Sequence, residues 1–134
     1  RLDAKLREDP QLRPYSLTTA KWRVLLRLHR APEGLSQSKL AEMVGVEGPT
    51  IVGLIDRREL DGLVERRPCP ADRRSKIVHL QPAGEALAPR LEAHVEQVRH
   101  EALGGIPPEA MQQCHAVLVA VRDALTALNH PKQE

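Results

Sequence analysis

The chain has 134 residues, enough for one domain with an appendage, and its 20 Lys+Arg against 18 Asp+Glu give a formal net charge of +2. With 41% apolar and 28% charged residues, the composition excludes a disordered chain. No apolar run approaches the roughly 18 residues of a membrane-spanning helix. The first residues lack the apolar core of a secretion signal, and two cysteines cannot form a disulfide framework. We therefore expect a cytoplasmic protein with no membrane partner.

Aromatic residues are scarce, with one Trp, one Tyr and no Phe. The core must come from Leu, Val, Ile and Ala, which favours packed helices over a β-sandwich. Stacking platforms for single-stranded nucleic acid need exposed rings and are not expected. The six histidines show no metal-ligand spacing, and no nucleophile–base pair or phosphate loop is present. We therefore expect that the protein is not an enzyme and binds no metal or cofactor.

The first third of the chain predicts helices joined by a proline-marked loop. Residues 2–8 look like the end of a helix, and residues 9–16 contain two prolines and turn formers. Hydroxyl residues at 18–19 then cap a helix whose apolar positions include Trp22, Leu25 and Leu26.

Two short helices follow, separated by a glycine turn. Ser36 caps a helix over residues 37–44, which Gly45 ends. The second helix begins near Gly48-Pro49, because proline fits the first turn, and Gly62 closes it.

From residue 63 to residue 80 the spacing of the apolar residues changes to the two-residue repeat of β-strands. Residues 63–67 and 76–80 read as two strands, and residues 68–75 form a polar connection between them that contains two adjacent arginines. This pattern predicts a β-hairpin with an arginine-rich tip.

The remainder is predicted to be helical. A long helix opens at Pro82, and Pro89 within it predicts either a kink or a later start. Residues 104–108 break the helix. The last helix carries an apolar stripe with the 3-4 spacing of a helix–helix seam, which favours a dimer interface over a core contact within the chain. The stripe consists of Met111, Cys114, Leu118, Val121, Leu125 and Leu128.

A short helix, a glycine turn, a second helix and an arginine-tipped hairpin make a winged helix-turn-helix. One α-helix fits the DNA major groove, and a wing arginine can enter the adjacent minor groove. From residue 57 to residue 76 there are seven basic and four acidic residues, a net +3 that exceeds the +2 of the whole chain. Positive charge is thus concentrated where the wing is expected.

Residues 17–84 resemble the MarR/SlyA family of winged helix-turn-helix transcription regulators. The resemblance lies in Leu35-Ser36-Gln37-Ser38-Lys39-Leu40-Ala41, in Gly62-Leu63-Val64-Glu65-Arg66, and in Asp72-Arg73-Arg74-Ser75-Lys76 running on to Leu80. It implies a mainly α fold with a small β-hairpin wing. It divides the chain into the end of an N-terminal dimerisation helix with a loop (1–16), a DNA-binding domain (17–81) and C-terminal dimerisation helices (82–134). It also implies a homodimer on palindromic operators, often released by small aromatic or phenolic anions.

Site residues follow from the resemblance position by position. Ser36, Gln37 and Ser38 would meet phosphates at the start of the first helix of the motif. The recognition helix would present Pro49, Thr50, Gly53 and Arg57 to the major groove. Arg74, with Arg73 beside it, would act in the minor groove, and Lys76 would also bind DNA. Asp72 would orient an arginine by a charge-assisted hydrogen bond. Trp22 is expected first as a core residue. Because the equivalent helix of the family lines the cleft between the DNA-binding and dimerisation parts, Trp22 and Leu26 would also face an effector such as a small aromatic carboxylate. The dimer seam would include Met111, Leu118, Val121, Leu125 and Leu128.

Four positions depart from the family pattern. Gly53 stands where relatives often have a base-reading arginine, which predicts weak direct readout. Arg58 replaces a core leucine, while Leu60 falls at a polar position. Either Arg58 extends past the core to solvent, or the helix rotates locally to bury Leu60. Gln81 replaces a threonine cap before Pro82, at an expected cost of about 1 kcal/mol.

These observations predict a DNA-binding transcription regulator, acting as a repressor, with double-stranded DNA, a second copy of itself and a small effector as partners. The alternative is a winged-helix interaction module that dimerises without binding specific DNA.

Overall fold

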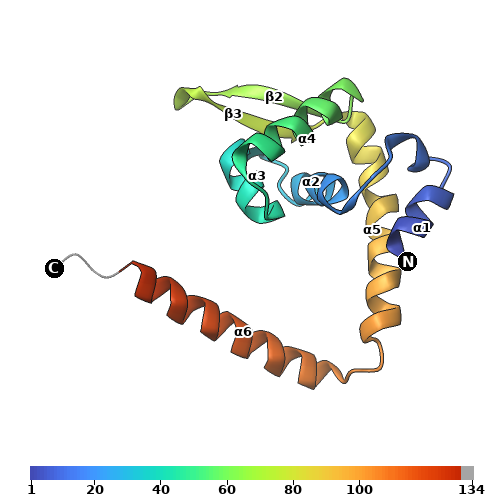
Figure 1. The fold of residues 1–134 in the computed structure, drawn as a ribbon, viewed down its shortest axis with the longest axis vertical. Coiled ribbons are helices and arrows are strands. Elements are labelled where there is room, and N and C mark those ends of the chain that lie inside the picture. Colours follow the sequence, from blue (N-terminus) through green and yellow to red (C-terminus); the bar gives the residue numbers. More distant parts are fainter. Residues whose placement is uncertain (131–134) are drawn as a thin grey trace. The chain divides into compact units, whose positions relative to one another are not determined.

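The computed structural model describes residues 1–130, and their secondary structure is mainly helical. The helices are α1 (Leu2–Glu8), the 3-10 helix η1 (Arg13–Tyr15), α2 (Thr19–His29), α3 (Gln37–Val44), α4 (Gly48–Leu60), α5 (Pro82–Leu103) and α6 (Pro108–Asn129). The strands are β1 (Leu35–Ser36), β2 (Val64–Cys69) and β3 (Asp72–Leu80). The fold class is therefore the expected one, helices with a small antiparallel hairpin (Figure 1). None of the helices within residues 1–130 is long and apolar enough to cross a membrane.

The chain divides into two compact units, residues 1–98 and the residues from 99 onward. The first unit holds α1 to α4, the sheet and most of α5. The second holds the end of α5 and α6. Each unit is described by itself below.

The core of the first unit is aliphatic, as the lack of Phe predicts. Leu25, Leu40, Ile55, Leu63 and Val78 are all completely buried. They come from α2, α3, α4, the α4–β2 turn and β3, so a single cluster joins the three helices to the sheet. Full burial of an aliphatic side chain contributes about 1.5–3 kcal/mol, which makes this cluster the main source of the unit's stability.

The helix boundaries follow the capping residues closely. Ser36 Oγ accepts a hydrogen bond from the Lys39 backbone N–H at 3.1 Å at the start of α3. Gly45 ends that helix with φ 78°, a left-handed conformation that glycine adopts without steric cost. α4 begins at Gly48 with proline in its first turn, and Gly62 follows it with φ 73°.

The sheet is more extensive than the strand pattern indicates. The strands were expected at 63–67 and 76–80 with a connection over 68–75, but β2 and β3 pair up to Cys69 and Asp72 and leave a two-residue turn. A third strand, β1, pairs with β3 through Leu35 and Val78 and was not predicted. Backbone hydrogen bonds extend the hairpin although its outer residues are polar, and the shift in register at Pro68/Cys69 accommodates a residue without an N–H.

α5 begins at Pro82 and continues through Pro89 without interruption, so the later start considered from the sequence is wrong. Pro89 lies in the second turn of the helix, where it costs the hydrogen bond that its N–H would have donated. Buried Leu87 and Leu91 pack α5 onto the core on either side of it.

Candidate DNA-binding surface

The exposed face of α4 carries the residues expected to read DNA. Pro49, Thr50, Gly53 and Arg57 are all exposed, whereas Ile51 and Ile55 turn inward. A Cβ added at Gly53 would meet no atom of residues 1–130 within 4 Å. The Arg57 guanidinium lies 3.5 Å from the carboxylate of Asp61 in the next turn, but two-thirds of its side chain is exposed. The face is open, as insertion into a groove requires.

The hairpin tip carries the cations expected in the wing. Arg73, Arg74 and Lys76 are exposed, and within residues 1–130 none of them pairs with an acidic side chain. Figure 1 shows the tip extending past the helices of the first unit. Asp72 was expected to orient an arginine side chain. Instead, it accepts hydrogen bonds from the Arg74 backbone N–H at 2.9 Å and from Ser75 Oγ at 3.2 Å. Its two oxygens hold the turn, and the Arg74 guanidinium is left to solvent.

The start of α3 is used partly for internal contacts. Ser36 caps the helix, and the Gln37 side-chain oxygen accepts a hydrogen bond from Arg66 Nε at 2.6 Å. Ser38 is exposed. Of the three residues expected to meet phosphates, two therefore also have structural contacts that fix their side chains.

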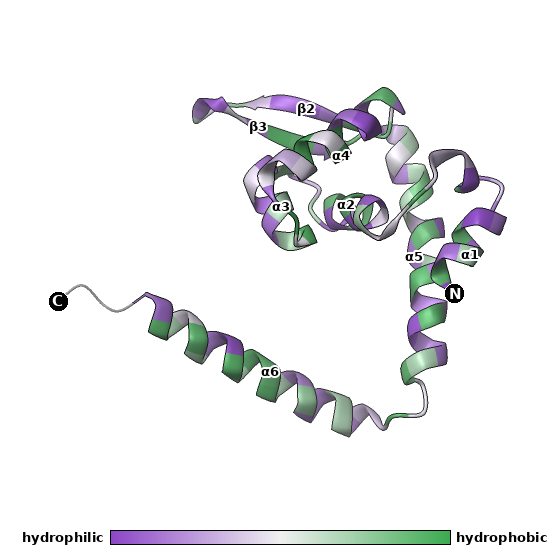
Figure 2. Cartoon of the chain, in the orientation of Figure 1, coloured by the Kyte–Doolittle hydropathy of each residue, from purple (hydrophilic) through white to green (hydrophobic). Residues whose placement is uncertain are grey.

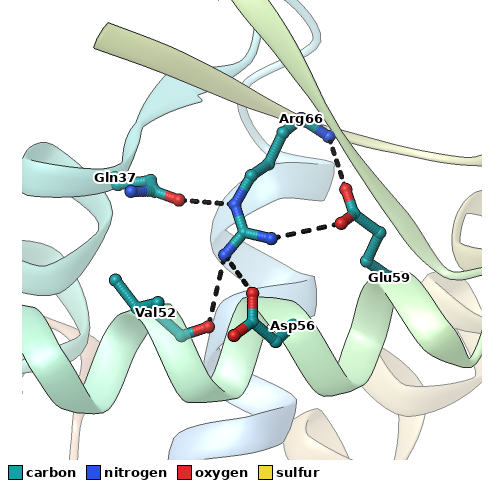
Figure 3. Close-up of polar contacts among 5 residues, drawn as sticks. All are labelled: Gln37, Val52, Asp56, Glu59 and Arg66. Carbon is teal, nitrogen blue, oxygen red and sulfur yellow. Dashed lines mark hydrogen bonds and ion pairs between the residues drawn. The ribbon is translucent and has the colours of Figure 1, made fainter. Parts of the chain in front are cut away.

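Arg66 is a positioning residue that the sequence pattern did not identify (Figure 3). Besides its bond to Gln37, the guanidinium lies 2.6 Å from Asp56 Oδ1 and 3.2 Å from Glu59 Oε1, and it donates to the Val52 carbonyl at 3.3 Å. The Arg66 backbone N–H also donates to Glu59 Oε2 at 3.1 Å. Arg66 thus joins β2 to α3 and α4 and sets where the hairpin lies against α4. Its place in the Gly62–Arg66 stretch was the only signal, and from the sequence it counted simply as one more positive charge.

Two of the other arginines between residues 57 and 76 are also engaged within the protein. Arg67 pairs with Glu65 on the same strand. Arg58 is only 1% exposed, so both expectations for it are wrong: it does not reach solvent, and Leu60 is 84% exposed rather than buried. Helical phase places position 58 inward, and α4 keeps that phase throughout. Among the basic residues from 57 to 76, Arg73, Arg74 and Lys76 are thus exposed without an acidic partner in residues 1–130, while Arg57 is exposed beside Asp61.

A cavity of about 490 Å³ lies in the first unit between α1 and the start of α2. Leu6 and Leu17 supply apolar walls, Arg7 and Arg13 supply positive charge, and Asp3 supplies one negative charge. Neither Trp22 nor Leu26, the expected effector contacts, lines it. Leu26 is 4% exposed and belongs to the core, and the Trp22 indole N–H has no hydrogen-bond partner within residues 1–130.

The apolar stripe of α6 is exposed in the second unit. Met111, Val121 and Leu125 are 39%, 50% and 56% exposed, and Leu118 and Leu128 are more exposed still. Figure 2 shows apolar and polar residues alternating along the whole helix. All five residues of the predicted seam lie on this helix, between Pro108 and Asn129.

Comparisons with known proteins agree with this architecture. A family model described as the MarR family matches residues 15–75. A solved transcriptional regulator, PA3341, is 36% identical over 93% of this chain and 90% of its own, with a TM-score of 0.78. A MarR-family regulator from Silicibacter pomeroyi is 30% identical over 100% of this chain and 86% of its own, with a TM-score of 0.71.

A third similar structure was solved with a ligand bound. CouR from Rhodococcus jostii RHA1, solved bound to p-coumaroyl-CoA, is 28% identical over 99% of this chain and 87% of its own, with a TM-score of 0.67. The family model, the similarity over nearly full length and the winged helix-turn-helix architecture all agree, and the chain belongs to the MarR family of transcriptional regulators.

Proposed function

We propose that this protein is a repressor that binds double-stranded DNA as a homodimer, with α4 in the major groove and the β2–β3 hairpin at the minor groove. The observation that carries the proposal is the hairpin tip, where Arg73, Arg74 and Lys76 are exposed without acidic partners in residues 1–130. Guanidinium groups favour the concentrated negative potential of a narrow minor groove. A regulator of this kind acts where the chromosome is, so we expect it in the cytoplasm.

The dimer supplies the second recognition helix. The exposed leucines and valines of α6 form an apolar stripe that a folded protein covers with another surface, and a second copy of the same helix has the matching pattern. Two α4 helices about 34 Å apart would enter successive major grooves on one side of the duplex, which predicts a palindromic operator.

We further propose that a small aromatic acid releases the repressor by occupying the cavity between α1 and α2. Its apolar walls suit a ring, and Arg7 and Arg13 outnumber Asp3, so the lining has a net positive charge that suits a carboxylate. The ligand of CouR, a phenolic acyl thioester, is chemically related. By linkage, a ligand that weakens DNA binding is itself bound more weakly when DNA is present.

The wing is tested by measuring binding to an AT-rich palindromic duplex at several salt concentrations. We expect Arg74→Ala to raise the Kd about tenfold, equivalent to about 1.4 kcal/mol, and to make the salt dependence shallower because fewer counterions are released. Arg27→Ala is the matched control, because it removes the same charge from an exposed position on α2. Unchanged binding by Arg74→Ala would refute the role of the wing. Absence of salt-sensitive duplex binding by the wild type would instead favour an interaction module.

A further inference from the structure

Arg58 is a charged residue enclosed in the core of the first unit. It follows Ile51 and Ile55 on the inner face of α4, and its side chain is 1% exposed. Burial lowers the pKa of Arg58 from its ordinary value, and the Asp61 carboxylate opposes that shift. A buried guanidinium is costly unless its N–H groups are hydrogen bonded, so its few partners carry unusual weight.

Those partners are a nearby carboxylate and a distant backbone carbonyl. Nη2 lies 3.1 Å from Asp61 Oδ2, but that oxygen accepts no hydrogen bond within residues 1–130, so the attraction is one of charge alone. Nη1 donates to the Tyr15 carbonyl at 3.1 Å, and Nε has no partner in the described part of the chain. The bond to Tyr15 is therefore the one side-chain hydrogen bond within residues 1–130 that satisfies the guanidinium.

Tyr15 lies at the end of the loop between α1 and α2, directly before a strained residue. Ser16 has φ 47° and ψ 55°, the left-handed region, and is the one non-glycine residue with positive φ in residues 1–130. The Ser16 carbonyl accepts a hydrogen bond from Lys21 Nζ at 3.2 Å, and Ser16 also lines the cavity. The loop that Arg58 holds is thus the same loop that borders the proposed effector site.

We propose that Arg58 is a positioning residue that ties the α1–α2 loop to the C-terminal half of α4, so that the conformation of the loop at Ser16 controls DNA affinity. The inference rests on the proposed DNA-binding function and supplies a route from the cavity to the recognition helix. If Tyr15 moves, the guanidinium must follow it or lose its hydrogen bond while buried. Because Arg58 is part of α4 and losing that bond in the core costs free energy, displacement of the loop favours a matching displacement of the helix.

A double-mutant cycle tests this coupling without any small-molecule effector. Ser16→Val places a β-branched residue where positive φ is strained and displaces the loop, whereas Ser16→Asn, which tolerates positive φ, is the matched control. We expect Ser16→Val to raise the DNA Kd about fivefold or more and to accelerate amide exchange across residues 57–62, and Ser16→Asn to change neither. In an Arg58→Met background, both effects of Ser16→Val should disappear.

Equal effects of Ser16→Val in the wild-type and Arg58→Met backgrounds would overturn the proposal, as would unchanged exchange over residues 57–62. Arg58→Lys provides a second background if Arg58→Met does not fold, because a single ammonium group lacks the fork that reaches both partners. Amide exchange is measured without DNA. A chain that binds no duplex but shows the coupled exchange would contradict the proposed function and leave the coupling intact, so the two failures are distinguishable.

Discussion

Two glycines in helices stand in opposite environments. Gly53 faces open space on α4, whereas a Cβ on Gly84 of α5 would lie 2.3 Å from the Leu63 carbonyl oxygen. Gly84 is therefore required for α5 to pack closely against the turn before β2. Gly53 has no such packing role in the first unit and leaves α4 without a side chain near its centre.

We expect Gly53→Ala to raise the free energy of unfolding by about 0.5–1 kcal/mol, because alanine loses less backbone entropy in a helix. Gly84→Ala should lower it by about 1–3 kcal/mol through overpacking. Urea denaturation of both variants checks the pair. A destabilised Gly53→Ala would show that α4 is covered at this position.

Arg58 and Arg66 show why residue roles are hard to read from a sequence. Helical phase correctly predicts that position 58 faces inward, but not that a guanidinium remains there. Arg58 donates its hydrogen bond to the carbonyl of Tyr15, which lies 43 positions away in the sequence. Arg66 likewise differs from its neighbour Arg67 only in the direction of its side chain on β2, and the acidic groups it binds lie on another element. Both roles depend on long-range contacts that a local pattern does not contain.

At the scale of elements, the loop after α1 is fixed to α5 by a buried carboxylate. Asp9 is 5% exposed, and its Oδ2 accepts a hydrogen bond from Arg90 Nε at 2.5 Å and lies 2.8 Å from His94 Nε2. Its other oxygen accepts from the Gln11 backbone N–H at 2.9 Å. Burial would raise the pKa of Asp9, but the bonds from His94 and Arg90 outweigh it and hold the pKa well below its usual range.

This shift predicts how the contact depends on pH. Since the folded pKa is below the unfolded value of about 3.9, the stabilisation is complete above that value and is lost as the pH falls through the folded pKa. We expect Asp9→Asn to lower the free energy of unfolding by about 1.5–3 kcal/mol near pH 6 and by about 1 kcal/mol less near pH 3, because the stabilisation declines by about 1.4 kcal/mol per pH unit below the unfolded pKa, as measured by urea denaturation. Glu8→Gln, at an exposed neighbouring acid, should have little effect at either pH. An equal deficit for Asp9→Asn at both values would refute the account.

The helices and the hairpin show which secondary-structure elements can be predicted from a sequence and which cannot. Caps, glycine turns and apolar periodicity correctly placed α3, α4 and α6, because each of these signals acts within a few residues. The pattern missed β1 and shortened β2 and β3, because those pairings are backbone hydrogen bonds between segments such as Leu35 and Val78. A polar hairpin tip gives no apolar alternation from which its strands could be recognised.

At the scale of the whole molecule, we predict that the apolar stripe of α6 forms the interface of a homodimer. We expect the double variant Leu118→Asp/Leu125→Asp to sediment as a monomer, because charges on the exposed stripe would have to be buried in the dimer. Its DNA affinity should fall steeply, since one recognition helix reads only a half-site. Sedimentation velocity and DNA titration measure the two effects.

The control for this prediction lies on the opposite side of the same helix. Ala116→Asp/Ala127→Asp adds the same charge at exposed positions away from the stripe and should remain dimeric. A dimeric Leu118→Asp/Leu125→Asp variant would rule out the stripe as the interface.

By itself, the sequence determined the class of fold, the helix-turn-helix with its wing and the family, because capping, periodicity and the Asp72–Lys76 stretch are local signals. Only the tertiary structure decided which arginines are available to a ligand. Arg58 and Arg66 are held by carbonyls and carboxylates of other elements, while Arg73 and Arg74 remain exposed. The physical reason is that the role of a charge depends on its solvation and on its partners in space, and the folded chain brings those partners together from distant positions.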